Sequence, residues 1–128
     1  MRNISFMILG TGIDLIEIER IKKVFENRER KYLEKVFTEE ELRYSFSFKD
    51  PYTHLAARFC AKEAFYKAIG EGFFILHEIG IVNKKNGKPE IQLFGKTLEM
   101  WKSKGSPSVF VSLSHSSTMA MAIVILEK

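Results

Sequence analysis

Apolar residues are spaced differently in the two halves of the chain. In the first half they recur every three or four positions, most clearly over residues 16–25 and 51–69, which is the spacing of helices. In the second half, short apolar runs are separated by turn residues, which is typical of strands. The pattern predicts an α+β fold in which a mainly antiparallel sheet packs with a long central helix.

The predicted helices carry start and stop signals. Thr38-Glu39-Glu40-Glu41 is a capping box that should begin a helix at its second residue. Pro51 suits the first turn of the long helix, and Gly70 suits the position just beyond its end. Weaker patterns predict short helices over residues 32–36 and 96–104.

The predicted strands begin with residues 6–15, a β-rich segment punctuated by Gly10 and Gly12, which fits a strand that another element approaches closely. Asn86-Gly87 is a hairpin signal between two later strands. Near the end of the chain, Ser114–Thr118 should form the polar connection of a buried hairpin. The remaining predicted strands cover residues 78–83, 90–94, 108–113 and 119–126.

Length and composition fit one domain that spans residues 1–128, of which 45% are hydrophobic and 28% charged. A chain this short buries only about two-thirds of its unfolded surface, so a second subunit could complete a site. Cys60 is the single cysteine and has no metal-ligand spacing with His54 or His77, which argues against a disulfide and against zinc. No signal peptide or membrane span is predicted, and we expect a cytoplasmic protein.

The charge balance favours anionic partners. Lys and Arg outnumber Asp and Glu by 20 to 16, which gives a formal net charge of +4. A small nucleic-acid-binding module is one alternative, because Phe46, Phe48 and Tyr52 lie near Lys49. No recognisable nucleic-acid motif accompanies these residues, so we expect no nucleic-acid partner.

Asp14 is the first candidate for chemistry. It interrupts the apolar first strand just after Gly10-Thr11-Gly12. A carboxylate in that setting costs free energy unless it is paired or binds a cation. The pattern alone leaves two simpler roles open: Asp14 could cap the following helix or pair with a nearby lysine.

The long helix offers a second group of candidates. Glu63 and Lys67 are four residues apart and share a face, while Arg58 and Lys62 share a neighbouring one. Such a surface could present a metal-binding carboxylate together with phosphate-binding cations. The simpler alternative is a solvated helix with one ion pair between residues i and i+4.

His115 lies among three serines at the predicted connection, where hydroxyl, backbone N–H and imidazole groups could bind a phosphate. It could equally be an ordinary turn histidine. A hydrolase triad of Ser114, His115 and Asp14 is disfavoured, because no G-x-S-x-G motif surrounds the serine.

Three segments resemble the holo-acyl-carrier-protein synthase family of phosphopantetheinyl transferases, in the same order and at the same separation. They are Gly10–Arg20, Arg58–Gly70 with its Lys-Glu-Ala-x-x-Lys core, and Ser112–Ser116. Residues 37–42 and 86–89 match as well, so that the similarity extends over nearly the whole chain.

The resemblance implies the phosphopantetheinyl transferase fold, assembled as a homotrimer with coenzyme A at the subunit boundaries. It implies transfer of 4′-phosphopantetheine from coenzyme A to a serine of apo-acyl carrier protein, in fatty acid biosynthesis. The products would be holo-acyl carrier protein and adenosine 3′,5′-bisphosphate. A different carrier domain, such as one of a peptide synthetase, is the alternative acceptor.

The resemblance also assigns roles to residues. Asp14 and Glu63 would bind Mg²⁺ and act in catalysis, with Glu63 the preferred general base and Lys67 a catalytic contact to the phosphates. The residues that would bind the rest of coenzyme A are Arg58, His115 and Ser116.

A basic face would receive the acidic helix of the carrier protein. Its residues would be Arg20, Lys23, Arg28 and Arg30. The chain departs from the family pattern at Asn27, where another carrier-binding arginine is expected, and several residues precede the usual glycine-containing strand.

Overall fold

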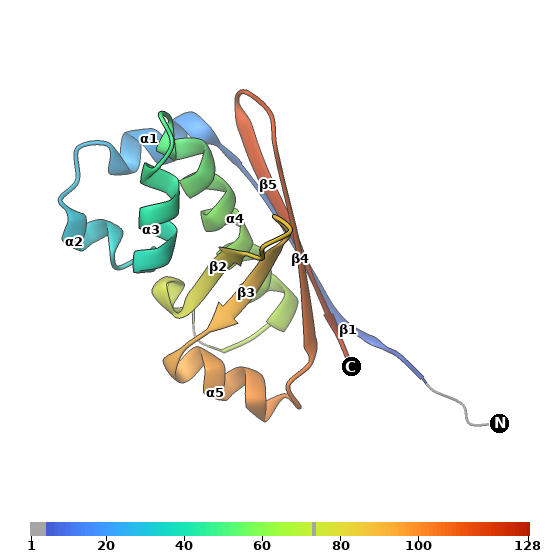
Figure 1. Cartoon of the computed structure of the whole chain (residues 1–128). Coiled ribbons are helices and arrows are strands. Elements are labelled where there is room, and N and C mark those ends of the chain that lie inside the picture. The colour runs from blue at the N-terminus through green and yellow to red at the C-terminus, as the bar shows by residue number, and fades with distance from the viewer. Residues whose placement is uncertain (1–4, 73) are drawn as a thin grey trace.

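The computed structural model describes residues 5–72 and 74–128, and it shows an α+β fold in which a sheet packs against one long helix (Figure 1). The elements follow in the order β1 (Ile8–Glu17), α1 (Ile18–Phe25), α2 (Arg30–Leu33), α3 (Glu39–Phe46), α4 (Pro51–Ile69), a 3-10 helix (Leu76–Glu78), β2 (Ile79–Asn83), β3 (Pro89–Leu93), α5 (Gly95–Ser103), β4 (Ser108–His115) and β5 (Met119–Glu127).

The described strands form two antiparallel sheets, which confirms the predicted strand orientation. The larger has the order β1-β5-β4, and the smaller is the β2–β3 hairpin. Gly87, with φ of 86°, lies in the turn of that hairpin, as its sequence signal predicted. β5 is the central strand of the larger sheet, and its inward-facing residues Ala120, Ala122, Val124 and Leu126 are buried against α4.

Two glycines let β1 lie unusually close to α4. A Cβ atom added to Gly10 would lie 2.0 Å from the carbonyl oxygen of Ala68, and one added to Gly12 would lie 1.8 Å from that of Ala64. Any side chain at these positions would push the strand off the helix. The close approach predicted for this strand is therefore confirmed.

The long helix begins and ends as its sequence predicted. The Asp50 carboxylate accepts a hydrogen bond from the backbone N–H of Tyr52 at 3.0 Å, and Pro51 occupies the first turn. Gly70 ends the helix in the left-handed conformation, with φ of 84°. The sheet covers one side of α4, and α1 and α3 cover the other (Figure 1).

Some element boundaries differ from the prediction. α1 begins at Ile18 rather than at residue 16, because Ile16 and Glu17 still pair with β5. α2 covers Arg30–Leu33 rather than residues 32–36, and Leu33 is its buried residue. β4 continues through His115, which pairs with Ala120, so Ser114 and His115 lie in the strand rather than in the connection.

None of the helices in the described part of the chain is long and apolar enough to cross a membrane.

Candidate functional site

Asp14 lies on the inner face of β1, opposite Ala122 of β5. Its side chain is 17% exposed, and its Oδ1 accepts a hydrogen bond from Nζ of Lys67 at 3.2 Å. Lys67, half exposed on α4, also donates to the carbonyl oxygen of Ile13 at 3.0 Å. The predicted pairing of Asp14 with a lysine is confirmed, and the predicted helix-capping role is wrong because Glu17 is the N-cap residue of α1.

Glu63 faces the same place from α4. It lines a cavity of about 340 Å³ together with Asp14 and Arg20. Burial raises the pKa of Glu63, and the negative charge of Asp14 raises it further, while Lys67 opposes both effects. Two carboxylates from separate elements are thus held close together with one cation, and Lys67 pairs with Asp14 rather than with Glu63.

This arrangement suits a hard divalent cation. Asp14 and Glu63 line one cavity, and Lys67 pairs with Asp14 alone, so the two carboxylates hold more negative charge than this ammonium neutralises. The described residues contain no group of three or more His, Cys, Asp or Glu side chains able to hold a metal ion. A cation held by Asp14 and Glu63 would therefore need its other ligands from water or from a bound phosphate, as Mg²⁺ prefers.

Lys62 does not lie on the surface, contrary to the interpretation that it shares a phosphate-binding face with Arg58. Its side chain is completely buried, and Nζ donates to Oε1 of Glu41 at 2.6 Å. It also donates to the carbonyl oxygens of Leu76 and Ile79. The ammonium group is thus fully used inside the fold and is not available to a ligand.

The predicted nucleotide-binding residues lie near one another but differ in exposure. Arg58 is only 3% exposed, and its guanidinium carbon lies 4.3 Å from the centre of the Tyr44 ring. His115 is exposed at the end of β4. Ser116 begins the connection to β5, where its Oγ accepts hydrogen bonds from the backbone N–H groups of Thr118 and Met119.

A Ser-His-Asp hydrolase triad is ruled out by the strand geometry. Ser114 and His115 are consecutive residues of β4, so their side chains point to opposite faces of the sheet. His115 pairs with the buried Ala120 and therefore faces α4, while Ser114 faces outward. The hydroxyl and the imidazole cannot meet.

The four predicted docking residues are all exposed, but they are not equally free. Arg30 forms ion pairs with Glu34 at 3.3 Å and Glu39 at 3.0 Å. Arg28 donates to the carbonyl oxygen of Val24. In the described part of the chain, Arg20 and Lys23 have no ion-pair partner, so they are the better placed for an acidic partner.

Three residues near the site were given no part in it from the sequence. Glu41 belongs to the predicted capping box, and its hydrogen bonds with Thr38 confirm that prediction. Cys60 lies buried beside Asp14, and burial raises the pKa of its thiol to about 12. His54 lies near Arg58 and His115. Only the four-residue spacing of His54 and Arg58 could have revealed this neighbourhood from the sequence.

Comparison with known proteins matches nearly all of the chain. The family described as the 4′-phosphopantetheinyl transferase superfamily matches residues 10–122. The holo-[acyl-carrier-protein] synthase of Treponema denticola is 45% identical over 124 residues, which cover 94% of this chain and 99% of that protein. The chain belongs to the holo-[acyl-carrier-protein] synthase family of this superfamily.

Solved structures of family members share the fold. The enzyme from Neisseria meningitidis superposes with a TM-score of 0.82 at 34% identity, over 95% of this chain and 100% of that one. The enzyme from Bacillus anthracis, solved in complex with CoA (3′,5′-ADP), superposes with a TM-score of 0.77 at 34% identity, over 95% of this chain and 98% of that one. The α+β fold of the family is therefore the fold of this chain.

Proposed function

We propose that this protein transfers 4′-phosphopantetheine from coenzyme A to a serine of apo-acyl carrier protein, as one domain over residues 1–128. The observation that carries the proposal is the meeting of Asp14, Glu63 and Lys67 beside one cavity in a member of this family. The fold thus brings together three charged residues from the segments that match the family.

The proposed reaction is a phosphoryl transfer. The carrier serine Oγ attacks the β-phosphorus of coenzyme A, and a new P–O bond forms. The bond between that phosphorus and the bridging oxygen breaks, which releases adenosine 3′,5′-bisphosphate. The serine proton passes to a base, for which Glu63 is our candidate, because its carboxylate lines the cavity beside Asp14 and Arg20.

Asp14 and Glu63 would hold Mg²⁺, and their excess negative charge fits that ion. When bound, Mg²⁺ would supply positive charge to neutralise the pyrophosphate of coenzyme A. Lys67 would contribute a second positive charge near the leaving oxygen, since its ammonium already lies beside Asp14. Arg58, His115 and Ser116 would bind the nucleotide end of the cofactor.

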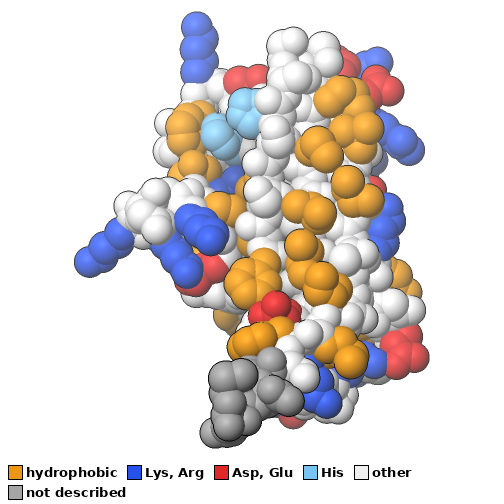
Figure 2. Space-filling view, turned by 90° about the vertical axis from the view of Figure 1, so that its right-hand side faces the viewer, with side chains coloured by type: hydrophobic (Ala, Val, Ile, Leu, Met, Phe, Trp, Pro, Cys, Tyr) orange, Lys and Arg blue, Asp and Glu red, His pale blue; other side chains and the backbone are white. Residues whose placement is uncertain are grey.

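The outer face of the larger sheet supports assembly as a homotrimer. Ile13 and Leu15 of β1 are 55% and 59% exposed, and Phe110 and Ile123 of the neighbouring strands are exposed as well. Figure 2 shows apolar side chains in a band over this face. An apolar patch of this kind is typical of a subunit interface, and three copies meeting there would bring sites to the subunit boundaries.

Docking of the carrier would use the exposed basic residues of α1 and the loop after it. Arg20 lines the cavity that holds Asp14 and Glu63, so an acidic helix bound there would place its neighbouring serine close to the two carboxylates. Lys23 lies on the same helix and is exposed. Cytoplasmic location remains a prediction from the sequence.

Mass spectrometry of purified apo-acyl carrier protein tests the proposal directly. Incubation with the protein, coenzyme A and Mg²⁺ should add about 340 Da, the mass of one phosphopantetheine arm, and EDTA should prevent the gain. A gain on a peptide-synthetase carrier domain but not on acyl carrier protein would select the alternative acceptor. No gain on either carrier would refute the transferase proposal.

A further inference from the structure

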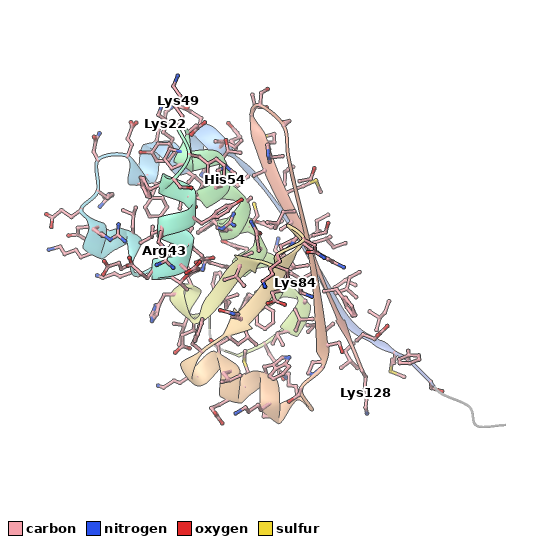
Figure 3. The ribbon with its side chains drawn as sticks, viewed as in Figure 1. Lys22, Arg43, Lys49, His54, Lys84 and Lys128 are labelled. Atoms are coloured by element: carbon pink, nitrogen blue, oxygen red, sulfur yellow. The ribbon has the colours of Figure 1, made fainter. Side chains whose placement is uncertain are left out.

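A cluster of three basic side chains lies between α4, α3 and the end of β4. His54 and Arg58 are four residues apart on α4 and therefore share a face. His115 reaches the same place from the inner face of β4, and its charge acts on His54. Histidine side chains gather at one place on the face drawn in Figure 2, and Figure 3 shows His54 on the part of α4 near the β4–β5 hairpin.

The Arg58 guanidinium in this cluster is incompletely satisfied. The residue is 3% exposed, yet its buried Nε has no hydrogen-bond partner within the described residues. Its Nη1 donates to the carbonyl oxygen of His54, but this contact is long at 3.5 Å. A buried donor without a partner costs free energy, which a bound acceptor would recover.

The His54 ring is held in place without using its nitrogens. It stacks on Phe48 with ring centroids 3.9 Å apart, and Tyr44 contacts it edge-on at 5.4 Å. Neither ring nitrogen has a hydrogen-bond partner among the residues that the structure describes. The aromatic neighbours therefore orient an imidazole whose polar atoms remain available.

The charges around His54 favour an anionic ligand. Burial lowers the pKa of His54, and the positive charges of Arg58 and His115 lower it further, while Asp50 alone opposes them. A dianion bound beside the ring would reverse this balance and stabilise the imidazolium. Binding of such an anion should therefore take up a proton.

We infer that His54 is a third basic group of the phosphate-binding site formed by Arg58 and His115, and that it selects ligands carrying the phosphate on the nucleoside 3′ position. The inference rests on the proposed function for its natural ligand, coenzyme A, whose nucleotide end carries that phosphate. The phosphate would accept hydrogen bonds from the unpaired nitrogens of Arg58 and His54. Lys62 cannot contribute, because Glu41 and two carbonyl oxygens occupy its ammonium.

The test compares two small probes that differ in one phosphate. Calorimetry should measure the affinities of adenosine 3′,5′-bisphosphate and adenosine 5′-monophosphate for the whole protein, at constant Mg²⁺ and at several pH values from 6 to 8. The His54→Phe variant keeps an aromatic ring against Phe48 and Tyr44 but removes both ring nitrogens. His77→Phe is the matched control, because His77 is exposed and its Nδ1 hydrogen-bonds with the backbone carbonyl oxygen of Lys35.

At pH 6.5, His54→Phe should lose about tenfold in affinity for the bisphosphate, as expected for a hydrogen bond to a charged group, and less than about twofold for the monophosphate. The ratio of wild-type to variant affinity for the bisphosphate should fall as pH rises, because His54 loses its proton. This ratio cancels the phosphate's own ionisation. His54→Gln, which keeps a donor but cannot become charged, should bind the bisphosphate with intermediate affinity and reduce the proton uptake.

Equal losses for both probes would overturn the inference, since they would show that His54 only supports the fold. An affinity ratio that does not change with pH, or no loss at all, would overturn it too. Failure of the proposed function would be recognised separately: the wild-type protein would then not modify apo-carrier in the mass assay, whatever His54→Phe does to the binding of the two probes.

Discussion

Two adjacent residues of α4 belong to opposite kinds of charged site. Lys62 is completely buried and saturated, with one carboxylate and two carbonyl oxygens around its ammonium. Glu63 is partly exposed beside a cavity, next to a second carboxylate that Lys67 only partly neutralises. The charge of the first site is neutralised inside the fold. The second site leaves negative charge available for a ligand.

The two sites also differ in what surrounds them. Glu41, the partner of Lys62, accepts hydrogen bonds from the backbone N–H groups of Thr38 and Ile81 as well, so it ties α3, α4 and β2 together. Within residues 5–72 and 74–128, Asp14 has one ionic partner, and that partner is half exposed. The comparison teaches that one charged residue of a family motif can be paired inside the fold while its neighbour stays available to a ligand.

Removing the buried ion pair of Lys62 and Glu41 should have the largest effect, and this effect should be on stability. Lys62→Met removes the ammonium but leaves the buried Glu41 carboxylate without its ionic partner, which should lower the free energy of unfolding by about 3–5 kcal/mol. Urea denaturation followed by circular dichroism measures the change. The matched control is Lys67→Met, whose half-exposed ion pair should cost less than about 1 kcal/mol. Similar losses in the two variants would erase the distinction between the sites.

Breaking the ligand site should instead affect activity. Asp14→Ala and Glu63→Ala should each reduce Mg²⁺-dependent transfer to apo-carrier to below about one hundredth of the wild-type rate, because electrostatic stabilisation is lost. Both variants should still fold, as their far-ultraviolet circular dichroism would show. Full transfer by either purified variant would remove that residue from the proposed metal site.

Arg20 and Arg30 offer the same comparison at the surface, between a charge that is available and a charge that is already paired. Arg20 has no ion-pair partner among the described side chains, whereas Arg30 is held by Glu34 and Glu39. Arg20→Glu should raise the apparent KM for carrier about tenfold, with little change in the KM for coenzyme A. Arg30→Glu should raise it less, because its charge is already engaged. Steady-state kinetics with each substrate varied would decide, and equal effects of Arg20→Glu on both substrates would argue against docking.

The smallest effect concerns pH and the stability of the protein without metal. The pKa of Glu63 is higher in the folded than in the unfolded protein, so the folded state favours its protonated form. Its contribution to stability is therefore greatest at low pH and is lost as pH rises through the folded pKa. Glu63→Gln should become more stable relative to wild type between pH 4 and 7 in EDTA, as thermal melts would show. A constant difference across that range would contradict the raised pKa.

Much of the fold could be predicted from local signals. The capping box at Thr38 and the ends of α4 at Pro51 and Gly70 were confirmed, because each depends on contacts within a few residues. The boundary of β4 was wrong by two residues. The sequence Ser114-His115 resembles a turn, but pairing with β5 across the sheet keeps it extended.

The sequence by itself determined which residues are the candidates for chemistry, because the motifs around Asp14, Glu63 and Lys67 are those of the family that matches this chain. Only the tertiary structure decided what each charge does. Packing of α3 and β2 against α4 buried Lys62 with Glu41, and the pairing of β4 with β5 placed His115 near His54. The physical reason is that helical spacing shows which side chains share a face, but desolvation and pairing depend on elements that come from far along the chain.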